Sequence, residues 1–308
     1  MTLYHPTESH QFKVRDALLQ KSLRPEQLPF PIASEYPLVL GPQGNAFSYC
    51  YNHLGQLCSH ANLWPRRVFD NVSQEHFMIG LVGNVATDPR WRGQGHMRNL
   101  LTAIEASAQQ YKLAALLLWS DLSTFYQNLG FQSLGKEFHF HFTGGLAEIR
   151  FKTGAQIRQV DSQNLTDSEL QRLMDLRYPL AFNIDRSVAE FRCMLTIPWL
   201  NLWIASDGDL LVGYALLGKG YDMMGVIHEW GVHDMNHLID IVHTIRLSDK
   251  LENCILLAPF LLENAWYREL LLESSALDTL PMALIKILSP DLALDRLSNL
   301  FIWGLDSI

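Results

Sequence analysis

Apolar residues follow two different periods along this chain, and the change from one to the other predicts alternating strands and helices. A continuous apolar run over residues 113–119 predicts a strand that is buried on both faces. Another apolar run over residues 77–87 predicts a second strand, which ends before Pro89 because proline has no N–H for the ladder. A helical spacing follows at Met97, Leu100, Leu101, Ile104 and Ala108.

Similar patterns predict the remaining elements of the first half. They are a helix at residues 8–22, a hairpin at 47–51 and 56–63, a short helix at 124–129 capped by Ser123, and a strand at 131–142 with one aromatic face. The proline-rich residues 23–42 are predicted to form a loop.

After Gly144-Gly145 the same order of elements restarts. The predicted elements are a strand at 156–160, a helix at 167–176, a hairpin at 202–205 and 211–217, a strand at 225–232, a helix at 236–250 and a strand at 254–261. The chain is therefore predicted to be an α/β (α+β) protein of two lobes, residues 1–145 and residues 146–308.

The segment between the strand ending near Thr87 and the following helix contains Gly93 and Gly95. Glycine lets a ligand approach the backbone closely, and the N-terminus of a helix presents unpaired N–H groups with partial positive charge. The segment therefore predicts a phosphate site. No Gly-Lys-Ser/Thr follows the glycines, and a third glycine is missing, so neither a P-loop nor a dinucleotide fingerprint is present.

Composition sets the class of protein. With 308 residues, 48% of them apolar and 18% charged, the chain is long enough for two folded domains. A formal net charge of −8 argues against general nucleic-acid binding and favours a cationic partner. The N-terminus shows no secretory pattern, and no apolar run is long enough for a membrane span. The four cysteines are far apart without a Cys-x-x-Cys pair, which is typical of reduced thiols in a cytoplasmic protein.

The glycine segment resembles motif A of the GNAT superfamily of acyl-CoA N-acyltransferases, Arg/Gln-x-x-Gly-x-Gly/Ala, with Arg92, Gly95 and Met97 at its positions. Met97 departs from the small residue that is usual there, and Gly95-His-Met-Arg is similar to the enhanced-intracellular-survival branch. The tyrosine at 126 with Gly130-Phe131 resembles motif B, Tyr-x-x-x-Gly-Phe. The predicted order of elements is also that of the superfamily.

This resemblance implies tandem GNAT lobes, each a mixed central sheet flanked by helices. The first lobe would bind acetyl-CoA, and the second would be a degenerate copy, because His233-Asp-Met-Asn-His237 replaces the glycines. The enhanced-intracellular-survival family also has a sterol-carrier-like third domain, for which residues 289–308 are too short. Its C-terminal carboxylate reaches the active site, and the sequence leaves open whether that holds in this chain.

The resemblance also implies roles for particular residues. Main-chain groups of Val85, Ala86 and Thr87 would pair with the pantetheine arm and the acyl carbonyl. The amides that would hold the pyrophosphate are those of Arg92, Gly93, Gln94, Gly95, His96 and Met97. Tyr126 would protonate the leaving thiolate, although it could equally be one more packed aromatic residue.

A general base is not identified by the sequence. Asp121 follows a predicted central strand, where open α/β sheets bind ligands, and is a candidate; a helix cap or a solvated turn residue is the alternative. No metal is expected. The histidine pairs His139/His141 and His233/His237 are interpreted as solvated or capping residues.

The predicted function is N-acetyl transfer from acetyl-CoA to a primary amine of a small or peptidic, cationic acceptor by direct attack. Such an amine titrates near ~10.4 and must first lose a proton. The alternative is a non-catalytic acyl-CoA-binding or scaffold protein of the same fold. No nucleic acid or membrane is expected as a partner, and a homo-oligomer is compatible with the sequence, which does not identify the acceptor.

Overall fold

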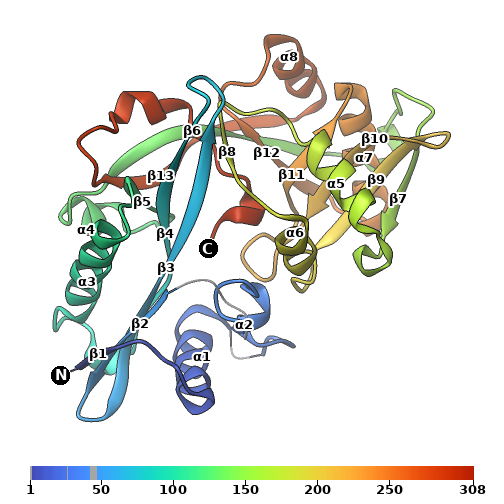
Figure 1. Ribbon diagram of the computed structural model, residues 1–308. Helices are drawn as coiled ribbons and strands as arrows, with labels where there is room; N and C mark the ends of the chain where they lie inside the picture. The colour runs from blue at the N-terminus through green and yellow to red at the C-terminus, as the bar shows by residue number, and fades with distance from the viewer. Residues whose placement is uncertain (1, 26, 42–46) are drawn as a thin grey trace.

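One mixed β-sheet runs through both halves of the chain in the computed structural model, which describes residues 2–25, 27–41 and 47–308 (Figure 1). In spatial order its strands are β1 (Thr2–Tyr4), β2 (Phe47–His53), β3 (Gln56–Asp70), β4 (Glu75–Thr87), β5 (Ala115–Leu118), β13 (Ala276–Ile287), β6 (Gln132–Thr143), β12 (Asn253–Pro259), β11 (Val226–Val232), β10 (Leu210–Leu217), β9 (Asn201–Asp207) and β7 (Gln156–Val160). The strand β8 (Phe182–Ile184) pairs with β3 outside this path.

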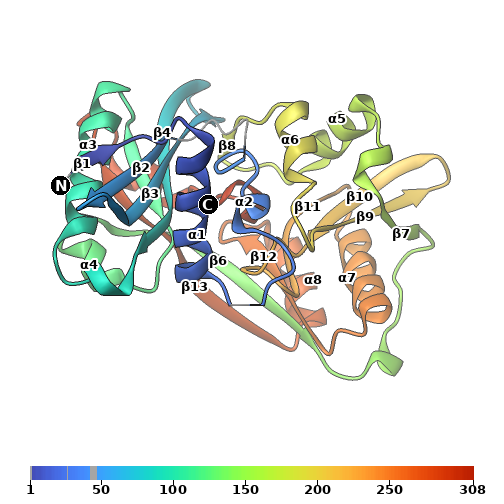
Figure 2. The same ribbon diagram turned by 90° about the horizontal axis from the view of Figure 1, so that it is seen from below.

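Helices cover both faces of this sheet. They are α1 (Ser9–Leu23), α2 (Ile32–Glu35), α3 (His96–Gln110), α4 (Ser123–Gln127), α5 (Asp167–Leu176), α6 (Val188–Met194), α7 (Met235–Asp249) and α8 (Asn264–Glu273). In Figure 2, α3 and α4 lie on one side of β2, β3 and β4, and α1 lies on the other. The predicted mixed α/β architecture is confirmed.

The two faces of the first-half sheet contribute to two separate apolar cores. Leu63 and Val82 pack with the buried residues of α3, while Trp64 and Leu81, their neighbours in sequence, pack into the core on the α1 side. This division follows from the strand period of two, which sends successive side chains to opposite faces. The helical spacing predicted for α3 is confirmed, because Leu100, Leu101, Ile104 and Ala108 are all buried.

The last strand returns to the first half of the chain. β13 pairs antiparallel with β5, through Leu284 and Leu118, and with β6 on its other side. β6 in turn pairs with β12 of the second half. The chain therefore exchanges strands between its halves. The boundary predicted at residues 145 and 146 stays a prediction; it falls between β6 and β7.

Several predicted boundaries were wrong. Ser123 is the first residue of α4 rather than its cap, which is Leu122. β3 extends to Asp70, well past residue 63, because its far end pairs with both β4 and β8. The predicted loop at residues 23–42 contains the short helix α2 in its described part. Long-range pairing and packing decide these details, and local periodicity does not report them.

Candidate active site

β4 carries a bulge at Asn84. Its pairing with β3 shifts register between His60 and Asn62, and Asn84 has a left-handed φ of 49°. The Nδ1 of His60 lies 2.9 Å from the carbonyl oxygen of Asn84. Burial lowers the pKa of His60 to about 3, so the ring is neutral near pH 7 and donates this hydrogen bond from Nδ1. A buried, neutral histidine thus holds the strained residue in place.

The pairing of β4 with β5 ends before the bulge. They pair in parallel only from Ile79–Leu81 of β4 to Ala115–Leu117 of β5 among the described residues. Further along β4, Ala86 and Thr87 still pair with β3 on one side. Their other side has no strand partner in the described chain, so it offers main-chain donors and acceptors to a ligand.

The loop between β4 and α3 leaves its backbone at Gly93 and Gly95 accessible to a ligand. Asp88 is buried, accepts hydrogen bonds from the backbone and side chain of Arg90, and has a pKa held below its ordinary value chiefly by that arginine. Gly93 and Gly95 have left-handed φ values of 76° and 78°, and Gly95 is the residue before α3. A Cβ at either glycine would meet no atom within 4 Å. The helix N-terminus therefore faces open space.

This open space is a pocket of about 640 Å³. It is lined by Ser22, Leu23, Val85, Ala86, Thr87, Trp91, Arg92, Gly93, Gln94, Gly95, His96, Met97, Arg98, Asn99, Leu122, Phe125 and Tyr126. The structure thus brings together every residue predicted to bind the coenzyme, along with Tyr126. Asp121 is exposed in the turn after β5 and does not line the pocket.

Tyr126 reaches the pocket from α4 and is 4% exposed. Its ring packs edge-on against Phe125 and Phe131, with centroids 5.0 Å and 5.7 Å away. Burial raises its pKa to about 12, so the phenol is protonated at neutral pH. Its hydroxyl has no hydrogen-bond partner in the part of the chain that the structure describes, which leaves this donor free for a ligand.

Sequence reasoning missed several residues of this site. Trp91, Leu122 and Phe125 supply its apolar walls, and each is a neighbour of a predicted residue in the sequence. Ser22 and Leu23 come from the end of α1, and His60 supports the bulge from β3. The sequence offered a signal for Trp91 and Phe125 alone, because each lies next to one of the two GNAT-like motifs.

The chain returns to this site at its last residues. A Cβ on Gly83 would lie 2.6 Å from the carbonyl carbon of Ile308, so the main chain of Ile308 packs directly against β4 beside the bulge. Lys219, which follows β10, is buried and donates to the carbonyl oxygen of Gly304 at 2.7 Å and to that of Ser307. These contacts fix the segment Gly304–Ile308, hereafter the tail segment, to the residues that follow β10.

Lys219 should give stability a measurable pH dependence. Burial lowers its pKa from 10.5 to about 8, so the native state loses this proton at lower pH than the unfolded chain. Above pH 8 the unfolded state binds more protons, and the free energy of unfolding rises with pH through this group. Relative to Lys219→Met, the wild type should gain about 1.5 kcal/mol between about pH 8 and pH 9.5 in urea unfolding. A difference between the two proteins that stays constant with pH would contradict this assignment.

The second half offers no equivalent anion site. Its corresponding helix, α7, begins after Asp234, whose carboxylate accepts a hydrogen bond from the backbone N–H of Asn236 at 2.7 Å. One free amide is thus already occupied, and a negative charge stands where a phosphate would lie. We expect calorimetry to give one coenzyme A per chain. A stoichiometry near two would show that the second half binds as well.

Other candidate sites have ordinary explanations. His139 and His141 share a face of β6 and pair with Glu137 and Asp278, at 2.7 Å and 3.0 Å. Among residues 2–25, 27–41 and 47–308, no group of three or more His, Cys, Asp or Glu is arranged to hold a metal ion. Within the same ranges, no helix has the length and apolar character required to cross a membrane.

Comparisons with known proteins agree with this geometry. Residues 49–133 match the family model described as the acetyltransferase (GNAT) domain. That range extends from β2 to the start of β6 and includes the bulge, the glycine loop and Tyr126. The predicted resemblance to GNAT acetyltransferases is therefore confirmed. A search of curated protein sequences found no match.

Solved structures share the fold of nearly the whole chain. A conserved protein of unknown function from Enterococcus faecalis V583, described as a probable N-acyltransferase, is 16% identical with a TM-score of 0.67, covering 93% of this chain and 73% of that one. A GCN5-related N-acetyltransferase from Anabaena variabilis ATCC 29413 has 11% identity, a TM-score of 0.65 and the same coverages. Eis1 from Mycobacterium abscessus has 12% identity and a TM-score of 0.60, covering 93% and 74%. At these identities the likeness establishes the fold.

Proposed function

We propose that this chain, which contains a GNAT acetyltransferase domain at residues 49–133, transfers the acetyl group of acetyl-CoA to a primary amine by direct attack. One observation carries the proposal. Among the described residues, one pocket is lined by the edge of β4 that has no strand partner, by the N-terminus of α3 and by a phenol whose hydroxyl has no hydrogen-bond partner. These are the donors that a thioester, its pyrophosphate and its leaving sulfur each require.

The coenzyme would lie along the pocket. The free amides at the start of α3 would bind its pyrophosphate, with Arg92 and Arg98 nearby to balance charge. The pantetheine arm would pair with main-chain groups of Val85, Ala86 and Thr87, as an added strand does at a sheet edge. The thioester would then stand between the bulge and Tyr126.

The reaction would proceed in one addition and one elimination. The amine nitrogen, once deprotonated, forms a bond to the thioester carbon while a main-chain N–H of β4 stabilises the carbonyl oxygen. The carbon–sulfur bond then breaks, and the sulfur takes a proton from Tyr126 as the thiol leaves, while the proton that the nitrogen gives up on forming its new bond passes through water and restores the phenol. Asp121 stays the candidate base for the amine proton. Its exposed position after β5 makes proton transfer through water the route to test with Asp121→Asn.

The acceptor is proposed to be a small or peptidic amine that carries positive charge, since the formal net charge of the chain is −8. Neither nucleic acid nor membrane is proposed as a partner. The four cysteines are free thiols, which suits a protein that works in the cytoplasm. Self-association is compatible with all of these proposals.

A second candidate function is acyl-CoA binding without turnover. No carboxylate is among the described residues that line the pocket, so no carboxylate base stands beside the place proposed for the thioester. A scaffold or sensor of this kind would bind acetyl-CoA and leave it intact.

Thiol release with an amine panel distinguishes the two functions. The purified chain is incubated with acetyl-CoA and with longer acyl-CoAs, each with small polyamines, amino sugars and lysine-containing peptides. We expect acetylated amine by mass spectrometry together with an equal amount of free coenzyme A. Tight acetyl-CoA binding without product from any amine would instead support the binding function.

A further inference from the structure

Three buried charged residues meet where the halves of the chain join. The guanidinium of Arg186 donates to both carboxylate oxygens of Glu229, at 2.9 Å and 2.8 Å. Its Nη2 also lies 2.7 Å from Oδ2 of Asp306. The side chains of all three residues are at most 1% exposed. One cation therefore bridges two carboxylates out of contact with water.

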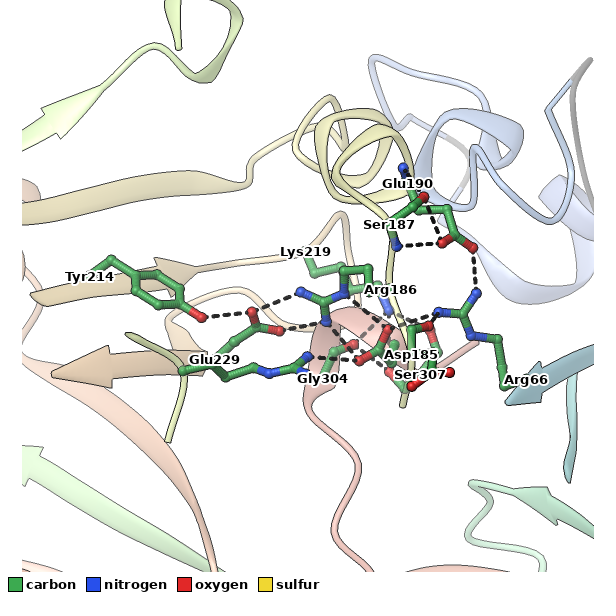
Figure 3. Close-up of polar contacts among 12 residues, drawn as sticks. Arg66, Asp185, Arg186, Ser187, Glu190, Tyr214, Lys219, Glu229, Gly304 and Ser307 are labelled. Carbon is green, nitrogen blue, oxygen red and sulfur yellow. Dashed lines mark hydrogen bonds and ion pairs between the residues drawn. The ribbon is translucent and has the colours of Figure 1, made fainter. Parts of the chain in front are cut away.

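These residues come from separate parts of the fold, and Figure 3 shows Arg186 between Glu229 and the tail segment. Glu229 lies on β11 and also accepts a hydrogen bond from the Tyr214 hydroxyl at 2.9 Å. Arg186 follows β8, the strand that pairs with β3 of the first half. Asp306 belongs to the tail segment. β11 thus holds one end of the bridge, and the tail segment forms the other.

Three arginines favour the ionised form of Asp306. Burial opposes ionisation, but the positive charges of Arg186, Arg66 and Arg177 together keep the pKa of Asp306 below its ordinary value. Arg66 and Arg177 lie farther away, at 3.8 Å and 3.9 Å, and Arg66 is already paired with Glu190 at 2.6 Å. Arg186 is therefore the main partner of Asp306.

Two residues, Ser307 and Ile308, connect the bridged Asp306 to the strand β4 beside the pocket. Asp306 precedes Ser307, which Lys219 holds, and Ile308, whose main chain touches Gly83 next to the bulge. Ile308 packs into the core on the α1 side, whereas Tyr126 and Met97 belong to the core on the α3 side. If the coenzyme occupies the α3 side, an attacking amine must approach the thioester from the other face, where the tail segment lies.

We propose that Arg186 and Asp306 are positioning residues, which hold the tail segment against β4 so that it forms a wall of the acceptor site. That this wall belongs to an acceptor site rests on the proposed function. The anchoring of the tail segment by Arg186 and Asp306 does not depend on that function. It assigns a purpose to the second half, which would orient a part of the first half's site without binding coenzyme itself.

The test compares Asp306→Asn with a matched control, Tyr214→Phe. The first variant keeps the shape of the side chain but removes the charge that Arg186 binds. The second removes a hydrogen bond to Glu229 in the same buried cluster without touching the tail segment. Tail order is measured by hydrogen exchange of a peptide that covers residues 303–308, where the amides of Asp306 and Ser307 bond to Trp303 and Gly304.

We expect exchange in this peptide to be about 10-fold faster or more in Asp306→Asn and unchanged in Tyr214→Phe. The Michaelis constant for the best acceptor should rise by about 10-fold, while coenzyme A affinity stays at its wild-type value. A general loss of stability would affect both variants and both ligands. If Asp306→Asn does not fold, Arg186→Lys replaces it, since lysine keeps the charge but lacks the fork that bridges two carboxylates.

Two results would overturn the inference. The first is tail exchange in Asp306→Asn, or in Arg186→Lys, that equals that of the wild type. The second is faster exchange with unchanged acceptor kinetics, which would show that the ordered tail segment does not shape the site. Failure of the proposed function gives a different result, because the wild type itself would then acetylate no amine. Hydrogen exchange of residues 303–308 would still show whether Arg186 and Asp306 anchor the tail segment.

Discussion

Tyr126→Phe should lower kcat for acetyl transfer by about 10²-fold or more, the scale expected for losing a positioned proton donor. Tyr126 lines the pocket proposed for the coenzyme, its hydroxyl has no hydrogen-bond partner among the described residues, and burial raises its pKa to about 12. The same apolar surroundings disfavour a bare thiolate, so a hydrogen bond from the phenol stabilises the sulfur as its charge develops. Phenylalanine keeps the contacts with Phe125 and Phe131 and removes only the donor.

The measurement is steady-state turnover on the best acceptor, with coenzyme A affinity by calorimetry. Affinity and thermal stability should change little, because the ring remains. Tyr49→Phe is the matched control, since Tyr49 is buried in the same core and does not line the pocket. Wild-type turnover in Tyr126→Phe would reduce this tyrosine to a packing role. A raised Michaelis constant with normal kcat would indicate a ground-state contact instead.

Gly95→Asp should weaken coenzyme A binding by about 10²-fold or more, through the carboxylate that it adds where phosphates are expected. Gly95 is the residue before α3, and a Cβ there projects into open pocket space. The left-handed φ of 78° also opposes a side chain, although aspartate tolerates that conformation better than most residues. The variant should therefore fold and lose the ligand.

Gly55→Asp separates charge from strain. Gly55 has a φ of 79° in the turn between β2 and β3, and a Cβ there also meets no atom within 4 Å. It does not line the pocket proposed for the coenzyme. Both variants therefore carry the same backbone strain and the same charge change. Equal affinity for coenzyme A in the two variants would refute the phosphate site at α3.

Local pattern was enough to predict much of the fold. Helix α5 spans Asp167–Leu176, the range that the sequence predicts, and in the structure Thr166 caps it with Glu169 completing a capping box. The clustering of the predicted residues around one pocket also followed from the sequence, since one continuous segment supplies the end of β4, the loop and the start of α3. A helix cap and a strand–loop–helix segment are each formed by residues a few positions apart, so the interactions that produce them can be inferred from the local sequence.

Features that depend on distant residues were not predictable in the same way. The periodicity of residues 276–287 does not indicate that this strand lies between β5 and β6. Arg186, Glu229 and Asp306 are far apart in sequence, and only the position of Glu229 in an apolar strand was unusual. Buried charges of this kind form only when the tertiary structure brings their partners together.

The exchange of β13 has a consequence for how the protein is made. Until residues 276–287 have left the ribosome, β5 and β6 lack the strand that lies between them, and each exposes an unpaired edge. The domain that carries the acetyltransferase motifs therefore cannot complete its sheet during synthesis, although its own residues emerge first. For the same reason, the two halves of the chain should unfold in one thermal transition. A fragment that ends before residue 276 should aggregate rather than act as a minimal enzyme.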